Sequence, residues 1–355
     1  MQGLSKELAR LGCDIDLVTM GFRQLPRHEQ TNGVNVYRVP CFRTRSSICY
    51  LPEMTSYVLA CVPTVRRRAR LGSYDLNHTH FIFPDALVSS LLKRLTGLPY
   101  VVTAHGSDVP GFNPNRFRFA HRLLKPIWRN VVRKAEEVIC PSRSLAQLVE
   151  RHCPGRSVTV IPNGIDVNQF SPRPKRRNQV LVVSRLFERK GVQHLLQALG
   201  DLRHSLVVHV VGAGPYLGEL QRFASQLYAD VQFHGWLDND SEQLRELFEA
   251  SSIFVFPSEP ENFPVVLLEA MTAGLAIITT EGTGCAEVVG DAALLVPPRD
   301  APAIRSALQA LLEDSGLCRT LGEAARARVE SKFSWSAIAR QYLASYERHV
   351  GQIVC

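Results

Sequence analysis

The sequence predicts an α/β protein built from two Rossmann-like, doubly wound domains. The first observation is the alternation of short apolar segments, such as QVLVVS at 179–184 and SIFVFP at 252–257, with segments of helical period. The second is that these segments are apolar almost throughout, which is typical of parallel strands covered by helices on both faces. The third is the length of 355 residues, which suits two domains of about 150–200 residues each.

The expected elements follow one another as strand and helix along the whole chain. Strands are expected at 14–20, 34–39, 75–80, 100–105, 137–140, 158–162, 179–184, 206–212, 231–235, 252–257, 275–280 and 292–297. Helices are expected at 85–96, 117–135, 142–152, 191–200, 241–250, 264–273, 301–313, 317–330 and 334–349. A segment rich in proline and arginine at 171–178 joins the two series. We therefore expect a first domain at 1–165, a second at 166–333 and a C-terminal helix at 334–355.

The charge is unevenly distributed. Residues 1–160 carry 23 Lys and Arg against 11 Asp and Glu, a net charge of +12, whereas the remainder carries 18 against 22, a net charge of −4. The basic half is either a solvated surface or the part that meets an anionic lipid surface or acceptor. Nucleic acid is not expected as a partner, because no recognition helix, zinc spacing or aromatic RNA-binding pattern occurs.

Other features of the composition limit the class of protein. No apolar run approaches the ~18 residues of a membrane-spanning helix. The start of the chain, SKELARLG, reads as a polar amphipathic helix and not as a signal peptide. Nine cysteines occur without a CxxC pair or a metal-binding spacing, which favours reduced thiols in a cytoplasmic protein.

Functional side chains are expected in the loops at the carboxyl ends of the strands, where open parallel sheets bind ligands. The loop after 179–184 contains Arg185 and Lys190, followed by Gly191 at a helix start. Two cations beside a helix N-terminus suit a phosphate or diphosphate, although such residues are often no more than solvated loop residues.

The loop after 252–257 continues as SEPENFPVVLLEAM and holds two glutamates, Glu261 and Glu269. Pro264 suits a helix start, and Asn262 is a candidate cap. The two carboxylates, one before the helix and one within it, suit a ligand with many hydroxyl groups. Alternatively, Glu269 satisfies a buried backbone group or an arginine.

Three further loops are weaker signals. The VGAGP turn at 211–215 lacks the third glycine of a dinucleotide fingerprint. Asp238 and Asp240 could suggest a metal, but they are better interpreted as caps of the next helix. Asn163 and Gly164 predict a turn with positive φ.

The first half contributes histidines at predicted strand ends. His105 and Asp108 lie in the small-residue loop TAHGSDVPG, where a functional and a structural role are equally plausible interpretations. His78 and His80 end the preceding strand, and for them a core or capping role is favoured over contact with an acceptor.

Together these stretches resemble the family-four retaining glycosyltransferases of the GT-B fold, in which two Rossmann-like domains face a cleft. The resemblance covers nearly the whole chain. Its most specific part is the block at 258–280 with Glu-x7-Glu, and the other parts are IPNGID at 161–166, SRLFERKG at 184–191, VGAGP at 211–215, the segment 285–300 and FSWSAIARQYL at 333–343.

The resemblance implies a retaining transfer of a hexose-type sugar from a nucleoside-diphosphate sugar, with no cofactor and no dedicated metal. It implies that Arg185 and Lys190 hold the diphosphate, Glu269 the ribose and Glu261 the donor sugar. It places His105, with Asp108, near the transferred sugar, and implies that the last helix crosses back to the first domain. The remaining donor-binding residues that it implies are Asn163, Gly164, Trp236, Leu237, Phe263, Val265 and Val266.

Two departures and several alternatives stay open. The first strand of the family and its glycine-rich loop have no counterpart here, so we expect that Met1 is not the native start. Pro264 occupies a position where many relatives carry glycine. The alternatives are a sugar-nucleotide epimerase, a glycoside hydrolase and a catalytically weak, non-catalytic partner. The expected acceptor is a glycan or a lipid-linked molecule, and the expected location is the cytoplasm, with peripheral contact to the inner face of an anionic membrane.

Overall fold

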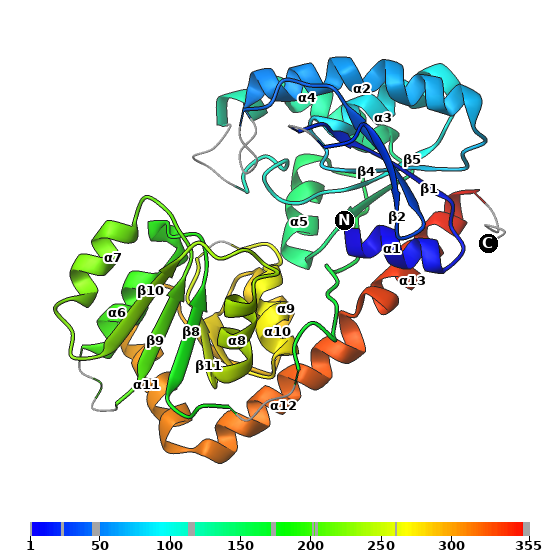
Figure 1. The fold of residues 1–355 in the computed structure, drawn as a ribbon. Helices are drawn as coiled ribbons and strands as arrows, with labels where there is room; N and C mark the ends of the chain where they lie inside the picture. The colour runs from blue at the N-terminus through cyan, green and yellow to red at the C-terminus, as the bar shows by residue number, and fades with distance from the viewer. Residues whose placement is uncertain are drawn as a thin grey trace. The chain divides into compact units, whose positions relative to one another are not determined.

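The computed structural model describes residues 2–22, 25–44, 50–112, 118–171, 175–200, 202, 205–259 and 261–350. The chain forms two compact units (Figure 1): unit 1 consists of Met1–Pro162 and Ile338–Cys355, and unit 2 of Asn163–Ala337. The last helix, α13 (Trp335–Val350), is therefore shared, because its first residues belong to unit 2 and the remainder to unit 1.

Unit 2 contains one sheet of six parallel strands in the order β10-β9-β8-β11-β12-β13. The chain enters the sheet in the middle at β8, builds two strands outward on one side and then three on the other, which is the doubly wound arrangement. The strands are β8 (Gln179–Val183), β9 (Val207–Val211), β10 (Asp230–Gly235), β11 (Ile253–Phe256), β12 (Ala276–Thr280) and β13 (Leu294–Val296).

Helices cover both faces of this sheet, which explains why its central strands are almost entirely apolar, whereas the edge strand β10 has the sequence DVQFHG. In β11, Phe254 and Phe256 point to one buried cluster, while Ile253 and Val255 point to the other. The helices that contribute to the first cluster are α8 (Glu242–Ala250), α9 (Val265–Thr272), α10 (Gly284–Val289) and α12 (Ser315–Lys332). Those of the second are α6 (Val192–Leu199), α7 (Leu217–Ala224) and α11 (Ala301–Glu313).

Unit 1 contains a parallel four-stranded sheet, β4-β5-β6-β7, and a separate three-stranded sheet, β1-β3-β2. The strands are β1 (Ile15–Met20), β2 (His28–Thr31), β3 (Val34–Val39), β4 (Asn77–His80), β5 (Tyr100–Thr103), β6 (Glu137–Cys140) and β7 (Thr159–Val160). The helices are α1 (Gln2–Arg10), α2 (Leu51–Leu71), α3 (Asp85–Thr96), α4 (Arg118–Lys134) and α5 (Arg143–His152). The described strands of unit 1 therefore form two sheets, whereas a doubly wound domain is expected to have one.

Two elements of unit 1 were not predicted. Strand β2 has the polar sequence HEQT, which carries no apolar alternation, and it forms only by pairing antiparallel to β3. Helix α2 has Pro63 within it and three arginines in a row near its end, both of which obscure a helical pattern. The helix survives because Tyr57 and Cys61, one turn apart, are buried against Val39 and Val88.

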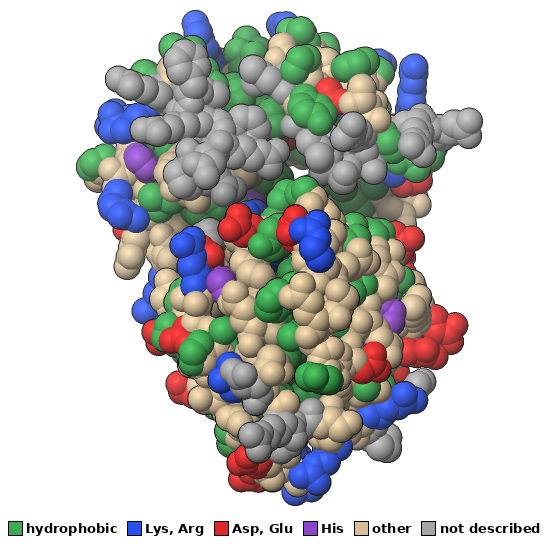
Figure 2. Space-filling view, turned by 90° about the vertical axis from the view of Figure 1, so that its left-hand side faces the viewer, with side chains coloured by type: hydrophobic (Ala, Val, Ile, Leu, Met, Phe, Trp, Pro, Cys, Tyr) green, Lys and Arg blue, Asp and Glu red, His purple; other side chains and the backbone are tan. Residues whose placement is uncertain are grey.

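Helices α2, α3 and α4 share a basic, partly apolar outer surface, and α3 packs against both of the others. Their sequences contain 12 Lys and Arg but only two acidic residues. Neither acid lies exposed: Glu53 is 1% exposed, and burial raises the pKa of Asp85 to about 7. Exposed apolar side chains interrupt the cations, and these are Leu59, Leu71, Leu91, Leu95, Leu123 and Ile127. In Figure 2, the part that belongs to unit 1 shows basic and hydrophobic side chains with few acidic ones.

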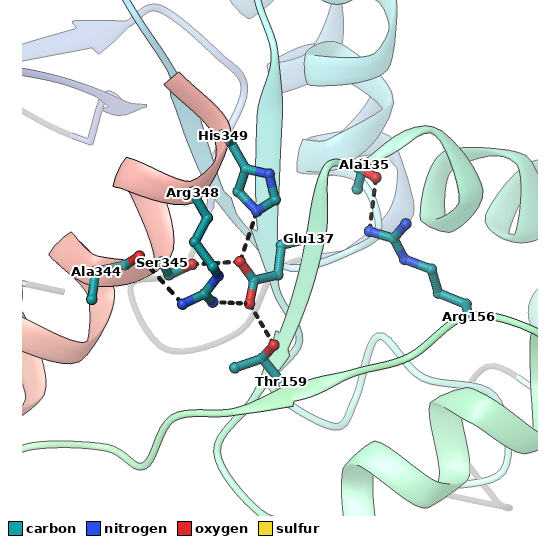
Figure 3. Close-up of polar contacts among 8 residues, drawn as sticks. All are labelled: Ala135, Glu137, Arg156, Thr159, Ala344, Ser345, Arg348 and His349. Atoms are coloured by element: carbon teal, nitrogen blue, oxygen red, sulfur yellow. Dashed lines mark hydrogen bonds and ion pairs between the residues drawn. The ribbon is translucent and has the colours of Figure 1, made fainter. Parts of the chain in front are cut away.

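A buried carboxylate, Glu137 at the start of β6, contacts several residues of helix α13 (Figure 3). Its oxygens accept hydrogen bonds from Ser345 at 2.7 Å, from Arg348 at 2.7 Å, from the hydroxyl of Thr159 and from His349 Nε2 at 2.8 Å. Burial by itself raises the pKa of this carboxyl, but the four hydrogen bonds outweigh it and lower the pKa to about 2.

This arrangement predicts that Glu137→Gln weakens unit 1. The folded pKa is lower than the ordinary value of 4.5, so the stabilisation by Glu137 is complete above about pH 4.5 and is lost as the pH falls toward 2. At pH 7 the variant should lose about 2–3 kcal/mol of unfolding free energy and therefore unfold at a lower temperature. Its stability should also depend less on pH between 4.5 and 2. Glu136→Gln is the matched control, since Glu136 forms only a partly exposed ion pair with Lys93. Equal losses in both variants, measured by thermal unfolding, would contradict the role of Glu137.

Candidate active site

The site of unit 2 lies where its sheet reverses direction, between β8 and β11. These strands are neighbours in the sheet, but the helices that follow them lie on opposite faces of it. The loops that lead to the two helices therefore separate and leave room at the carboxyl ends of the strands. The loop after β8 leads to Lys190, and the loop after β11 leads to Glu261. The predicted diphosphate-binding and sugar-binding residues therefore come from two loops that meet at the one place where such sheets hold ligands.

Lys190 and Glu261 form a direct ion pair in which both side chains are largely shielded, being 10% and 15% exposed. Ser258 donates a hydrogen bond of 2.6 Å to the same oxygen, Oε1, that pairs with Lys190. Lys190 Nζ also lies 5.4 Å from the centre of the Phe256 ring. Glu261 is thus fixed in one orientation by two donors, and the charge of Lys190 is paired with a carboxylate.

Glycines allow the loops of this site to pack closely. Gly191 has φ +74°, and a Cβ there would lie 2.1 Å from the carbonyl oxygen of Pro257. A Cβ on Gly284 would lie 1.6 Å from the carbonyl oxygen of Asn262, and the Gly284 amide donates to the Glu261 carbonyl at 3.0 Å. Gly212 and Gly214 in the VGAGP turn approach the loop after β8 in the same way, toward Ser184 and Leu186. The glycines of VGAGP therefore serve contact between loops.

Helix α9 begins beside Glu261 without a side-chain cap. The cap position is Pro264, with φ −71° and ψ 117°, so the expectation that Asn262 caps this helix is wrong. Proline has neither a side-chain acceptor nor an N–H, and the first amides of a helix lack partners within it. The amide groups at Val265 and Val266 are consequently the first that this helix can present to an anion.

Glu269 lies on α9, partly buried, and makes no side-chain hydrogen bond or ion pair within the described part of the chain. Burial raises the pKa of its carboxyl to about 7. The alternative that Glu269 satisfies an arginine or a buried backbone group is therefore wrong for the described residues. A carboxyl desolvated without a partner is typical of a group that binds a ligand.

The other predicted donor-binding residues lie at the same edge of the sheet or next to it. Arg185 is exposed, with its guanidinium 5.6 Å from the Phe187 ring centre. Trp236 is 63% exposed after β10, and its indole donates to Asp238 at 3.3 Å. Leu237 packs against the buried cluster that contains Phe263. The side-chain amide of Asn163 donates a hydrogen bond of 3.2 Å to the Phe263 carbonyl.

Two predictions about turns and caps are wrong. Gly164 does not have the positive φ expected of it; glycine is required because a Cβ would lie 2.4 Å from the Trp335 ring. Asp238 and Asp240 do not cap α8, since Ser241 occupies that position and accepts from the Leu244 amide. Hydroxyls compete well with carboxylates for this role, so the choice between neighbouring capping residues was not readable from sequence.

In unit 1, Asp108 holds together the loops that follow two adjacent strands. One of its oxygens accepts from the His105 amide at 2.9 Å, and the other accepts from the Ile82 amide at 2.7 Å. Asp108 is 4% exposed, and its own carbonyl accepts from the Trp128 indole at 2.9 Å. Its carboxylate is thus occupied by backbone groups, which suits the positioning of His105 better than direct participation in chemistry.

Sequence reasoning overlooked two residues of the loop after β11. Ser258 was not singled out, although its spacing of three residues from Glu261 is a usable signal. Glu259, which pairs through both oxygens with Arg299 at 2.7 Å, was also overlooked, because its partner lies 40 residues away in the loop after β13. No cluster of three or more metal-binding side chains occurs within the described residues. None of the helices described has the length and apolar character needed to cross a bilayer.

Comparison with known proteins identifies the class to which this architecture belongs. The fold aligns with the sucrose-phosphate synthase of Thermosynechococcus elongatus with a TM-score of 0.81 and 24% identity, covering 97% of this chain and 91% of that one. It also aligns with Anabaena Alr3699/HepE, whose structure contains UDP-glucose, with a TM-score of 0.72 and 21% identity over 89% of this chain and 87% of that one. The fold is that of the GT-B glycosyltransferases.

Sequence comparison then gives the family. Residues 1–169 match the model described as Glycosyltransferase Family 4, and residues 166–328 match that of Glycosyl transferases group 1. The N-acetyl-alpha-D-glucosaminyl L-malate synthase of Bacillus anthracis is 27% identical over 365 residues, which span 97% of this chain and 91% of the relative. The chain belongs to the family-4 glycosyltransferases, as its motifs predict.

The unpartnered carboxyl of Glu269 predicts a pH dependence of stability. Its folded pKa of about 7 exceeds the ordinary 4.5, so the folded protein holds a proton that the unfolded chain has released. Stability should therefore fall as the pH rises from about 4.5 to 7, and Glu269→Gln should remove that part of the fall. The measurement is thermal unfolding of the ligand-free protein across this range. Parallel curves for the wild type and the variant would contradict the raised pKa.

The ion pair predicts that Glu261 restrains Lys190 from binding anions. Glu261→Gln keeps the size of the side chain but removes the charge, so pyrophosphate should bind about 3- to 10-fold more tightly, equivalent to ~1 kcal/mol. Calorimetric titration with pyrophosphate measures this. Glu259→Gln is the control, because it removes an equal charge two residues away whose partner is Arg299. Unchanged or weaker binding by Glu261→Gln, relative to the control, would refute the restraint.

Proposed function

We propose that this glycosyltransferase moves a hexose-type sugar from a nucleoside-diphosphate sugar to a glycan or a lipid-linked acceptor, with retention of the anomeric configuration and without a dedicated metal ion. The observation that carries the proposal is the meeting of Lys190 and Glu261 at the switch point of the sheet, beside the uncapped start of α9. One loop supplies a cation and the other supplies an acceptor of hydroxyl hydrogen bonds.

The electrostatics of the site suit this reaction. Breaking the bond between sugar and diphosphate places negative charge on the leaving nucleoside diphosphate. Fixed groups that stabilise such charge lower the barrier without reorganisation, and here they are Arg185, Lys190 and the amides of Val265 and Val266. With two cations and a helix start directed to the diphosphate, charge neutralisation does not require a metal.

The carboxylates then bind the two sugars of the donor. Glu269 accepts hydrogen bonds from the ribose hydroxyls, which favour its charged form and so provide the partner that it lacks in the free protein. Glu261 accepts from hydroxyls of the transferred sugar, while Asn163, Gly164 and Phe263 line the adjoining loop. Trp236 and Leu237 lie against the nucleobase. His105 acts beside the transferred sugar, with Asp108 holding its loop.

Pro264 affects which sugar is accepted. A glycine at this position could donate its amide to a sugar hydroxyl, whereas proline has no N–H to give. Sugar selection is therefore left to Glu261 and the amides that follow Pro264. Two relatives support a nucleotide-sugar donor without fixing its identity: HepE has been crystallised with UDP-glucose, and the Bacillus synthase is named for an N-acetylglucosaminyl product.

The proposal predicts which ligands stabilise the protein. In a thermal-shift panel of UDP, GDP and ADP with their sugars, one nucleotide series should raise the unfolding temperature, because a ligand that binds only the folded state stabilises it by mass action. Glu269→Ala should weaken binding of every member of that series, and equal binding by wild type and variant would refute the ribose role.

The reaction catalysed separates the proposed activity from its alternative. Incubation with the stabilising donor and a panel of glycan and lipid-linked acceptors should yield a glycosylated acceptor. Isomerisation of the donor sugar without transfer would instead identify an epimerase. Binding of no nucleoside diphosphate at all would point to a non-catalytic protein.

We also propose that the outer surface of α2, α3 and α4 lies against the cytoplasmic face of an anionic membrane. This surface combines cations with exposed leucines and lacks exposed acids on the three helices, as described above. Cations attract anionic headgroups over a Debye length, and apolar side chains gain from entering the interface. A lipid-linked acceptor would then be reached at the bilayer surface. Part of the predicted basic segment, residues 113–117, lies outside the described residues.

This docking predicts lipid-dependent sedimentation. The protein should pellet with vesicles of phosphatidylglycerol and phosphatidylcholine, but not with phosphatidylcholine alone, and salt should weaken the binding. The double variant Leu123→Ser and Ile127→Ser should reduce binding several-fold, since these side chains are 69% and 45% exposed on α4. Leu295→Ser is the control, a similarly exposed leucine in unit 2. Binding that is independent of anionic lipid would refute the proposal.

A further inference from the structure

Two histidines at the ends of adjacent strands of unit 1, His80 and His105, are hydrogen-bonded to each other. Strands β4 and β5 pair in parallel with His80 opposite Thr103, so the ends of the two strands lie side by side. His80 Nδ1 lies 3.0 Å from His105 Nε2, and the two rings stack with centres 5.3 Å apart and planes inclined by 28°. His80 is thus the side chain that fixes one nitrogen of His105.

The neighbouring His78 is occupied elsewhere. Its Nε2 lies 2.9 Å from the Thr103 hydroxyl, and its Nδ1 lies 2.6 Å from the hydroxyl of Tyr346 on α13. The two histidines of H-x-H lie on the same face of the strand, because side chains two residues apart point to the same side, and their ring centres are 4.4 Å apart. Their hydrogen-bond partners nevertheless differ. His78 joins the strand to α13, whereas His80 is directed to His105.

The backbone at this point is strained, and the strain is maintained by the groups that hold His105. Phe81 has φ +75°, a conformation that is unfavourable for a bulky residue. Its ring lies 4.7 Å from that of His105, and its amide donates to the Thr103 carbonyl at 2.9 Å. Asp108 accepts from both the next amide, Ile82, and the His105 amide. Strain of this kind persists where the surroundings enforce it, and it is concentrated at functional sites.

The bond between the rings couples their tautomers. Of the two nitrogens in a hydrogen bond between neutral imidazoles, one carries a proton and the other accepts it. Burial lowers the pKa of both His80 and His105, so the pair is neutral near pH 7. The proton between the rings consequently determines which nitrogen of His105 carries its hydrogen.

We propose that His80 is a positioning residue of the transferase, which fixes the ring orientation and the tautomer of His105 through their direct hydrogen bond. The proposal rests on the proposed function, which places His105 beside the transferred sugar. His80 acts through His105 and has no contact of its own with substrate in this role. Phe81 and Asp108 support it by fixing the two strand ends from which the histidines project.

The test uses two substitutions of similar size and polarity. His80→Asn places an amide near the position of Nδ1 and can keep the bond, whereas His80→Gln places it one atom further out, near Nε2, and cannot. His209→Gln is the matched control, because His209 Nδ1 forms an equivalent contact of 3.1 Å with His234 Nε2 in unit 2. Thermal unfolding reports whether each variant folds.

The first readout is the nitrogen NMR spectrum of His105 in the whole, ligand-free protein labelled at histidine. Wild type, His80→Asn and His209→Gln should each show one tautomer of His105, and His80→Gln should show a mixture or the other tautomer. The same single tautomer in His80→Gln would overturn the proposal. This readout needs no activity, so it decides the proposal even if the protein transfers no sugar and the proposed function fails.

The second readout is the kinetics of transfer. His80→Gln should lower kcat by about 10- to 100-fold, a range typical of residues that orient a functional side chain. The KM for the donor should stay within about 3-fold of wild type, and His80→Asn should keep most of the kcat. Equal losses in His80→Asn and His80→Gln that follow their unfolding temperatures would show a merely structural role and overturn the proposal.

Discussion

The site of unit 2 depends on one topological constraint, the reversal of strand order between β8 and β11. Parallel strands cannot be joined by tight turns, so each needs a helix to return the chain. Helices α6 and α7 cover one face of the sheet, whereas α9 and α10, after the reversal, cover the other. The loops after β8 and β11 therefore separate at this place alone in the sheet. Lys190 and Glu261 are brought together by that geometry, and the glycines at 191 and 284 allow the backbone to follow it.

Much of this could be predicted from sequence because parallel strands leave a strong local signal. Continuous apolar runs located the six strands of unit 2, and the position of each loop after its strand placed Lys190 and Glu261 at one edge. Predictions failed where a choice depended on contacts distant in sequence. Gly164 is required by Trp335, and Glu259 forms an ion pair with Arg299 in a loop 40 residues later.

Buried carboxylates serve two different purposes in this protein. Asp108 and Glu137 are surrounded by donors, and each one ties together segments that the backbone alone leaves separate. Glu269 is desolvated but has no such donors within the described residues, and its raised pKa expresses that deficit. Satisfied carboxylates of the first kind stabilise the fold, whereas one of the second kind costs stability until a ligand supplies the missing hydrogen bonds.

The division of α13 between the units has a consequence for the order in which the protein is made. Glu137 and His78 acquire partners from 345–349, residues that a ribosome adds more than 200 positions after Glu137. Unit 2, at 163–337, is complete before those residues are added, whereas unit 1 has to wait for them. The half that is synthesised first is thus the half that finishes last, and during that interval Glu137 has the hydroxyl of Thr159 as a donor but lacks Ser345, Arg348 and His349.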